Sequence, residues 1–174
     1  MFADPNHSTF QFDLQSGSSV ADFGAGSGHY SLALARAVGE AGKVYAIDIL
    51  SDMLERLKNE AKREGFHHID VLHGDIEEVG GSRLGDESVD AVLASNVLFQ
   101  LENPQGLALE AKRILKKRGK SLIIDWKDSF GGIGPHHDSV FSEERAKDLF
   151  LREGFRLVKD ISAGRHHYGF IVKK

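Results

Sequence analysis

Asp22-Phe23-Gly24-Ala25-Gly26-Ser27-Gly28-His29-Tyr30 is the stretch of sequence that decides the fold. Its three glycines stand at alternate positions, between a short apolar run that ends at Phe23 and an alanine- and leucine-rich segment that begins at Tyr30. Such a turn lets a ligand approach bare backbone, and the N–H groups of the following helix face that ligand. We interpret it as a ligand-binding turn between a strand and a helix. By itself the glycine triplet also fits an ordinary tight turn of an α/β protein.

Strand-like and helix-like patterns alternate along the chain on either side of this turn, which predicts a mainly parallel sheet with crossover helices. We expect strands over residues 18–23, 43–49, 69–72, 89–94 and 121–126. Helices are expected over residues 30–38, 51–64 and 104–117, and from the N-cap Ser142 to Gly154. Residues 79–86 are glycine-rich and are interpreted as irregular or briefly helical.

The C-terminal residues 155–174 have a different pattern, that of two strands with only Ala163, Gly164 and Arg165 between them. A connection that short joins antiparallel strands. The expected fold class is therefore α/β, a seven-stranded, mostly parallel sheet with an antiparallel C-terminal hairpin.

Length and composition favour one compact domain over residues 1–174, since 174 residues with 41% hydrophobic content suit a single core. The net charge of −4 gives no general attraction to phosphate backbones, so nucleic acid is not the expected partner. The chain has no cysteine, which removes disulfides, thiolate metal ligands and cysteine nucleophiles, and no metal site is expected. No targeting or membrane-spanning segment is recognised, and a cytoplasmic location is the expectation.

Two aspartates follow the next two predicted strands. Asp48 ends the second strand, where a carboxylate can accept hydrogen bonds from ribose hydroxyls. Asp75 follows Gly74 at the tip of the third strand, where it can accept from an exocyclic amine such as that of adenine. Because the carboxyl ends of parallel strands share one edge of the sheet, these residues and the glycine turn indicate one nucleoside-binding site.

The run from Asp22 to Gly28 resembles motif I of class I S-adenosylmethionine-dependent methyltransferases, an acidic residue followed by Gly-x-Gly-x-Gly. His29 stands where the dinucleotide form would have its third glycine, so the resemblance favours S-adenosylmethionine over NAD as the cofactor. The likeness extends over nearly the whole chain, through Val44 to Asp48, Gly74 to Ile76 and Val89 to Asn96. It is closest to small bacterial relatives of the quinone-biosynthesis C-methyltransferases. The family's Leu-Lys-Pro-Gly-Gly turn is replaced here by Leu115-Lys116-Lys117-Arg118-Gly119.

The resemblance implies a Rossmann-like methyltransferase fold, with the last strand inserted between the fifth and the sixth. It also implies roles for particular residues. The glycines and Asp22 would line the methionine part of the cofactor, Asp48 would hold the ribose, Asp75 the adenine amine, and Asn96 would lie beside the sulfonium. The expected cofactor-binding residues are Asp22, Gly24, Ala25, Gly26, Gly28, Tyr30, Asp48, Ile49, Met53, Asp75, Ile76 and Asn96.

The acceptor side is expected where the turn at Gly164 reaches the same edge as the loop over residues 131–138. The doublets His136-His137 and His166-His167 are expected to meet there over the transferable methyl group. Histidines act near neutral pH, and Asp125 can do so if burial raises its pKa, so the candidate catalytic residues are His136, His137, His167 and Asp125. Surface histidines and loop glycines that merely turn the chain are an alternative that the sequence leaves open. Trp126, Phe99 and Tyr168 are candidate walls for an apolar acceptor, and residues 1–17, with Phe2, Phe10 and Phe12, are expected to cover the cofactor.

The favoured function is methyl transfer to a small-molecule acceptor. Asn96 is not followed by the prolines typical of adenine methyltransferases, and the absence of cysteine excludes carbon-5 methylation of cytosine and arsenite methylation. The basic residues from Lys112 to Lys120 are interpreted as a solvated face of the helix before the fifth strand. A nicotinamide-dependent oxidoreductase and a non-catalytic module that binds S-adenosylmethionine remain as alternatives.

Overall fold

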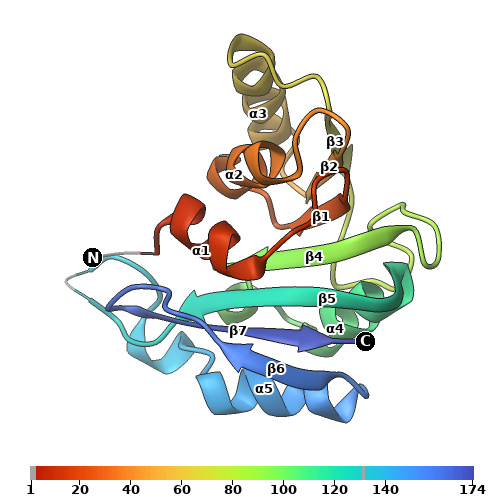
Figure 1. Cartoon of the computed structure of the whole chain (residues 1–174). Coiled ribbons are helices and arrows are strands. Elements are labelled where there is room, and N and C mark those ends of the chain that lie inside the picture. Colours follow the sequence, from red (N-terminus) through yellow and green to blue (C-terminus); the bar gives the residue numbers. More distant parts are fainter. Residues whose placement is uncertain (1–2, 131) are drawn as a thin grey trace.

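The computed structural model describes residues 3–130 and 132–174. Over these residues seven strands form one sheet (Figure 1): β1 (Ser19–Phe23), β2 (Lys43–Asp48), β3 (Ile69–His73), β4 (Val89–Ser95), β5 (Leu115–Trp126), β6 (Arg156–Asp160) and β7 (His167–Lys173). Their order is β3-β2-β1-β4-β5-β7-β6. The first five strands are parallel, and β7 is antiparallel to both of its neighbours.

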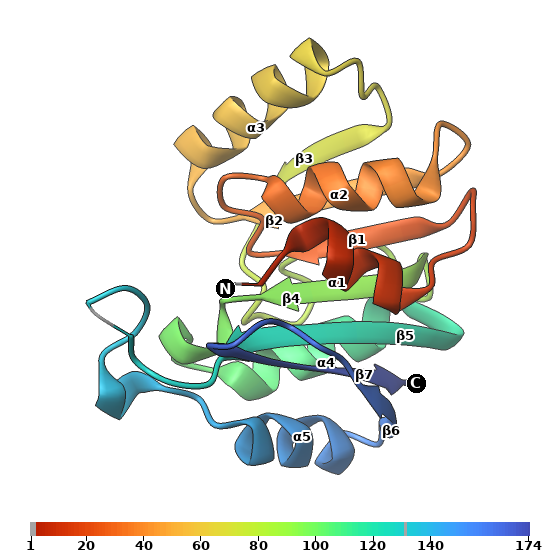
Figure 2. The same ribbon diagram turned by 60° about the vertical axis from the view of Figure 1, so that its left-hand side comes forward.

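The α-helices cover the two faces of the sheet: α1 (Pro5–Phe12), α2 (His29–Val38) and α3 (Ser51–Arg63) on one face, α4 (Pro104–Ile114) and α5 (Glu143–Arg152) on the other. Successive side chains of β4 point to opposite faces of the sheet, so Leu93 packs with α2 and Val92 packs with α4. Two short 3₁₀ turns, η1 (Leu98–Gln100) and η2 (His137–Ser139), follow β4 and β5. Figure 2 shows that the parallel strands run toward the edge where the start of α1 and the loop after β5 lie.

The expected topology is confirmed, because β7 pairs with β5 on one side and with β6 on the other. The first six residues of β7 are buried, as expected of a central strand. The connection between the two hairpin strands is longer than the three residues predicted, since it spans residues 161–166. Ile161, the first residue of this connection, packs closely on Gly169 of β7, where a Cβ would lie 2.7 Å from its side chain.

The predicted boundary between the fourth long helix and the fifth strand is wrong. The helix ends at Ile114 instead of continuing to about Lys117, and β5 already begins at Leu115. Leu115 is fully buried and pairs with Val89, and Arg118 adopts a left-handed conformation (φ 67°) where the pairing with β4 shifts register. Burial of Leu115 therefore ends the helix early, and most of the basic run lies on the first part of β5.

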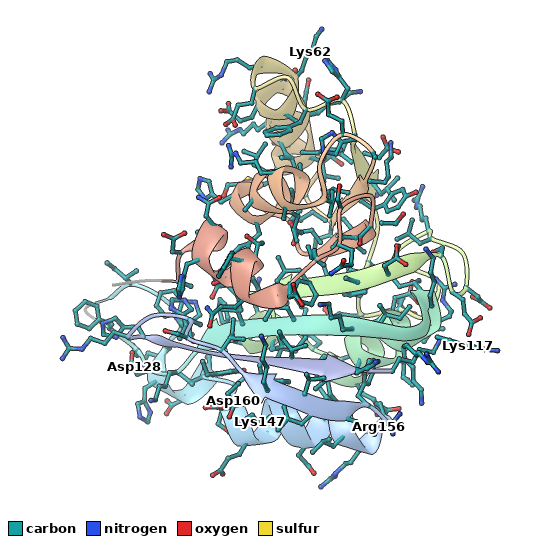
Figure 3. The ribbon with its side chains drawn as sticks, in the orientation of Figure 1. Lys62, Lys117, Asp128, Lys147, Arg156 and Asp160 are labelled. Atoms are coloured by element: carbon teal, nitrogen blue, oxygen red, sulfur yellow. The ribbon has the colours of Figure 1, made fainter. Side chains whose placement is uncertain are left out.

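The charges of this basic run are partly compensated by neighbouring carboxylates. Arg113 forms salt bridges with the buried Glu110 and with Asp86, and Lys116 forms one with Asp90. Lys117, labelled in Figure 3, lies at the opposite edge of the sheet from Asp128, which follows the carboxyl end of β5. The run is thus remote from the edge on which the site residues gather.

The N-terminal segment folds into α1, capped by the Asp4 carboxylate, which accepts from the N–H groups of Asn6 and His7. Of the phenylalanines expected to cover a cofactor, Phe12 is instead fully buried in the core and Phe10 is 83% exposed. Phe2 lies outside the described residues. The helix is attached to the connection between β6 and β7, because Gln11 and Ser162 form two hydrogen bonds of 2.9 Å with each other.

Among the described residues, no helix combines the length and the apolar character that crossing a membrane requires.

Candidate functional site

A cavity of about 780 Å³ opens at the carboxyl edge of the sheet, beside the glycine turn. Its walls come from the ends of β1, β2, β3 and β4 and from the start of the chain. Eleven of the twelve expected cofactor-binding residues line it: Asp22, Gly24, Ala25, Gly26, Tyr30, Asp48, Ile49, Met53, Asp75, Ile76 and Asn96. The structure therefore brings together residues that lie more than seventy positions apart in the sequence.

The glycines of the turn all have positive φ angles, but they serve different purposes. A Cβ on Gly24 would lie 2.3 Å from Val97, so this glycine lets the turn approach the segment after β4. At Gly26 a Cβ would have only the Gly24 carbonyl oxygen within 4 Å, at 3.9 Å, so space is left open beside the backbone. This open space lets a ligand approach the chain closely, although the N–H groups of Gly24, Ala25 and Gly26 already donate within the protein.

Gly28, the twelfth expected residue, does not belong to the cavity lining. It is buried at the N-cap of α2 with a φ of 83°, and a Cβ there would lie 2.2 Å from Leu57 of α3. The third glycine therefore allows close packing between α2 and α3, and its expected role in binding the cofactor stays a prediction.

Asp48 fastens the turn to the end of β2. One of its carboxylate oxygens accepts from the N–H of Gly26 at 2.8 Å, and the other accepts from the N–H of Leu50 at 2.9 Å. The side chain is 9% exposed, and each oxygen keeps a lone pair for a further donor. A diol placed in the cavity would meet a carboxylate that is already held in position.

Asp22 is buried at the end of β1 and accepts a hydrogen bond of 2.5 Å from the Ser31 hydroxyl. Burial raises the pKa of Asp22 to about 7; the Ser31 bond lowers this pKa and the nearby Asp48 charge raises it. A carboxylate with so little compensation favours a cationic group from a ligand.

The third strand contributes the opposite wall. The Asp75 carboxylate accepts from the N–H of Glu77 at 2.9 Å, and the neighbouring Ile76 is almost completely buried. Ile49 is 59% exposed although it is apolar, and it lines the same cavity. An apolar side chain left in water beside a cavity is suited to pack against a flat ring.

Two further polar groups border the cavity, Asn96 directly after β4 and Tyr30 in the first turn of α2. The Asn96 backbone is left-handed (φ 58°), and its buried Oδ1 has no hydrogen-bond partner among the described residues. Tyr30 lies near the hydroxyls of Ser8 and Ser95; burial raises its pKa, and these hydroxyls lower it in part. The open space at Gly26, the lone pairs of Asp48 and the orphan oxygen of Asn96 fit a nucleoside that carries a charged amino-acid chain.

The cavity also includes residues that the sequence did not single out, among them Ala3, Pro5, Ser95, Val97 and Leu101. Ser95 and Val97 flank Asn96, so their position next to a predicted site residue was the available signal. Ala3 and Pro5 belong to the segment over residues 1–17 that is expected to cover the cofactor, but their place within it depends on how α1 docks.

The four candidate catalytic residues are placed differently from the cofactor residues, and none of them lines the cavity. The side chains of His136 and His137 are 79% and 89% exposed, and both lie within 4 Å of the Asp138 carboxylate. Of the glycines in their loop, Gly134 packs against the Trp126 indole, 2.7 Å from where its Cβ would lie, and Gly131 lies outside the described residues.

The other histidine doublet is buried at the start of β7. His167 stacks on Trp126 with ring centroids 4.3 Å apart, and His166 stacks on Phe130 and contacts Asp128 at 2.9 Å. Burial lowers the pKa of His167 to about 4; the neighbouring His166 lowers this pKa further and Asp128 raises it. None of these four histidines lines the cofactor cavity, and their expected meeting over the methyl group stays a prediction.

Asp125 is fully buried near the end of β5. Its carboxylate accepts from the N–H groups of Leu98 at 2.8 Å and Trp126 at 2.7 Å. Burial raises the pKa of Asp125 to about 6, although hydrogen bonds from Trp126, Leu98, Phe99 and Val97 lower it. Asp125 does not line the cavity, and its expected catalytic role stays a prediction.

Comparison with known proteins places these features among methyltransferases. A family model described as a methyltransferase domain matches residues 14–160. The chain is 32% identical over 116 residues to arsenite methyltransferase of Aquipseudomonas alcaligenes, covering 64% of this chain and 34% of the relative. It is 27% identical over 158 residues to demethylmenaquinone methyltransferase of Anoxybacillus flavithermus, covering 84% and 65%. The chain therefore spans between a third and two thirds of the length of these two relatives.

Solved structures agree with this likeness over the full length of the chain. A SAM-dependent methyltransferase from Aquifex aeolicus superposes with a TM-score of 0.89 at 29% identity, covering 99% of this chain and 90% of that one. The expected Rossmann-like methyltransferase fold is thereby confirmed.

Proposed function

The chain belongs to the methyltransferase domain family whose model spans residues 14–160, and S-adenosylmethionine is the cofactor of this family. From this premise we propose that the protein transfers the methyl group of S-adenosylmethionine to a small-molecule acceptor. The observation that carries the proposal is the cavity beside Gly26, in which a bare backbone, the Asp48 carboxylate and the apolar Ile76 meet.

Each wall of the cavity would bind one part of the cofactor. Asp48 would accept from the ribose hydroxyls while it holds the N–H of Gly26, so the turn and the ribose share one anchor. Asp75 would accept from the adenine amine, with Ile49, Met53 and Ile76 against the ring. Asp22 would balance the ammonium group of the methionine part, which keeps this buried carboxylate ionised.

When bound, the cofactor supplies a methyl group on an already activated sulfonium, so the chain has to position the acceptor and exclude water. The segment from Ser95 to Leu101 borders the cavity at the end of β4 and is suited to that task. A general base is needed only for an acceptor that arrives protonated. The catalytic roles of His136, His137 and His167 stay predictions, and the place of Asp125 away from the cavity favours a different role for it.

The N-terminal segment over residues 1–17 is proposed to cover the cofactor, in a different way from that expected. Ala3, Pro5 and Asn6 line the cavity, whereas Phe12 belongs to the core. The fastening of α1 by Gln11 would hold this cover in place.

The acceptor is proposed to be a small apolar or aromatic compound. The demethylmenaquinone methyltransferase relative supports this class by its name. Arsenite is disfavoured, although another relative is an arsenite methyltransferase, because this chain contains no cysteine to bind it. Nucleic acid is disfavoured since the basic run lies at the edge of the sheet remote from the cavity. A cytoplasmic location is part of the proposal.

The proposal is tested by incubating the protein with methyl-deuterated S-adenosylmethionine and a metabolite extract, followed by mass spectrometry. A soluble demethylated quinol, arsenite and total nucleic acid are added in separate reactions. We expect deuterated methyl groups in a small organic product and none in methylated arsenic. Label only in nucleic acid would overturn the acceptor class, and binding of S-adenosylhomocysteine without any methylated product would favour the non-catalytic module.

A further inference from the structure

We propose that Asp125 is a positioning residue, a buried carboxylate that holds the turn over residues 96–101 against the cofactor cavity. This inference rests on the proposed function, because the turn would border the point where acceptor and cofactor meet. The turn comprises the last cavity-lining residues after β4, and Asn96, Val97, Gln100 and Leu101 of this turn line the cavity.

The turn depends on contacts from β5 for its position. Asn96 donates its N–H to the carbonyl of Ile124 at 2.9 Å, which continues the pairing of β4 with β5 by one residue. Directly beyond, the Asp125 carboxylate accepts from the N–H of Leu98 at 2.8 Å. Two successive residues of β5 thus hold two points of the turn, one through its backbone and one through its side chain.

The second carboxylate oxygen fixes the direction of the first. It accepts from the N–H of Trp126 at 2.7 Å, so both oxygens of Asp125 are bound to backbone donors and the side chain cannot rotate without losing one of them. A charged acceptor strengthens such bonds relative to a neutral one. The cost is the burial of a charge, since Asp125 is fully buried and its cross-strand neighbour Tyr168 is neutral.

The turn is also close to the glycine motif. Val97 occupies the space beside Gly24, where a Cβ would come within 2.3 Å. Asn96 is held in a left-handed conformation. Its buried Oδ1 has no hydrogen-bond partner among the described residues and can accept from a ligand. A shift of the turn would therefore move both a wall of the cofactor cavity and the one orphan side-chain oxygen of that turn. Asp125 acts on the site through this turn, without touching the reactants.

The test uses two substitutions, Asp125→Leu, which keeps the side-chain shape and removes both acceptors, and Asp125→Asn, which removes the charge and one acceptor. Asp90→Asn is the matched control, because Asp90 also accepts a backbone N–H, that of Ser19, but at the opposite edge of the sheet. Amide hydrogen exchange of residues 98–101 and the affinity for S-adenosylhomocysteine are measured together with the melting temperature at pH 8.

We expect the amides of residues 98–101 to exchange about tenfold faster in Asp125→Leu, as loss of a hydrogen bond to a charged acceptor implies. S-adenosylhomocysteine should bind roughly three- to tenfold more weakly, and Asp125→Asn should show smaller changes in the same direction. The melting temperature should change little, because removal of a buried charge offsets the loss of the acceptor for the N–H groups of Leu98 and Trp126. Asp90→Asn should leave turn exchange and affinity unchanged.

Unchanged exchange and affinity in both Asp125 variants would overturn the proposal. So would a loss of melting temperature with faster exchange throughout β5 and β7, since Asp125 would then support the sheet in general. If the wild-type protein does not bind S-adenosylhomocysteine, the proposed function fails, whereas the exchange data still report whether Asp125 holds the turn.

Discussion

At the scale of single residues, the buried aspartates Asp22, Asp48 and Asp125 divide the work of the site. Asp48 is satisfied by two backbone N–H groups beside the cavity, and Asp125 by two such groups away from it. Asp22 has one donor, the Ser31 hydroxyl, and shares its surroundings with Asp48. The same residue type therefore acts as an anchor, a positioning group and a site for positive charge, according to the donors that the backbone presents.

The raised pKa of Asp22 makes stability depend on pH in an unusual direction. Its folded pKa of about 7 lies above the unfolded value of 3.8, so its favourable contribution is present at low pH and is lost as the pH rises through 7. The free energy of unfolding of Asp22→Asn minus that of wild type should therefore increase by about 2–3 kcal/mol as the pH rises from 5 to 8. Asp125, with a pKa of about 6, contributes in the same direction.

Urea unfolding at several pH values measures this difference. The exposed Asp52→Asn serves as the control, and its difference from wild type should stay constant over the same range. If the difference between Asp22→Asn and wild type stayed constant from pH 5 to pH 8, Asp22 would already be ionised in the ligand-free protein and burial would not raise its pKa.

At the scale of elements, the glycine turn combines two requirements that its sequence does not separate. Gly26 leaves space beside the cavity, whereas Gly28 lets α2 approach α3 through Leu57. Both have positive φ angles, so glycine is favoured at each position for backbone reasons as well. The atoms that a Cβ would meet are what distinguish Gly26, which borders open space, from Gly28, which packs on Leu57.

Substitutions at the two positions should therefore have opposite profiles. Gly26→Val should abolish binding of S-adenosylhomocysteine, because its side chain fills the open space, and should lower stability by only ~1–2 kcal/mol for the strained backbone. Gly28→Ala should cost ~2–4 kcal/mol, since overpacking against Leu57 adds to the same strain. Gly65→Ala is the matched control, with φ 81° and nothing within 4 Å of the new Cβ.

Calorimetry and thermal unfolding of the three variants distinguish these effects. Normal binding by Gly26→Val would place the cofactor away from this turn. A Gly28→Ala protein as stable as Gly65→Ala would show that α2 and α3 are not closely packed at this position.

The first helix is the second element whose role can be tested directly. Gln11→Ala removes both hydrogen bonds to Ser162 and should loosen α1. If the N-terminal segment covers the cofactor, S-adenosylhomocysteine should bind about three- to tenfold more weakly, as expected from the loss of two neutral hydrogen bonds. The exposed Gln15→Ala is the control. Equal affinities of the two variants would mean that α1 is not part of the cover.

The order of elements was predictable from the sequence because hydrophobic periodicity and the short C-terminal connection constrain it strongly. The end of the helix at Ile114 was not, since Lys116, Lys117 and Arg118 continue a helix-like pattern and only the burial of Leu115 against β4 ends it. The cofactor residues at the strand ends were predictable because parallel strands share one edge. The histidines were not, because their direction depends on contacts with Trp126 and Phe130 that no local pattern encodes.

At the scale of the whole molecule, the two edges of the sheet have different characters. The carboxyl edge carries the cavity, α1 begins there, and the loop after β5 projects from it (Figure 2). The opposite edge carries the basic run, where Arg113 and Lys116 are paired with acidic neighbours. The hairpin of β6 and β7 extends the sheet on the side of α5, where Lys147 forms a salt bridge of 2.6 Å with Asp160 (Figure 3).

The central claim is that this cavity binds S-adenosylmethionine through the carboxylate at the end of β2, and calorimetric titration with S-adenosylhomocysteine tests it most directly. Wild type should bind one equivalent and show no binding of NADH, and Asp48→Ala should lose ~1.5–3 kcal/mol of binding free energy. Asp70→Ala, on the exposed side of β3 with a salt bridge to Lys43, should bind as wild type does. Binding of NADH in place of S-adenosylhomocysteine, or full affinity in Asp48→Ala, would contradict the account.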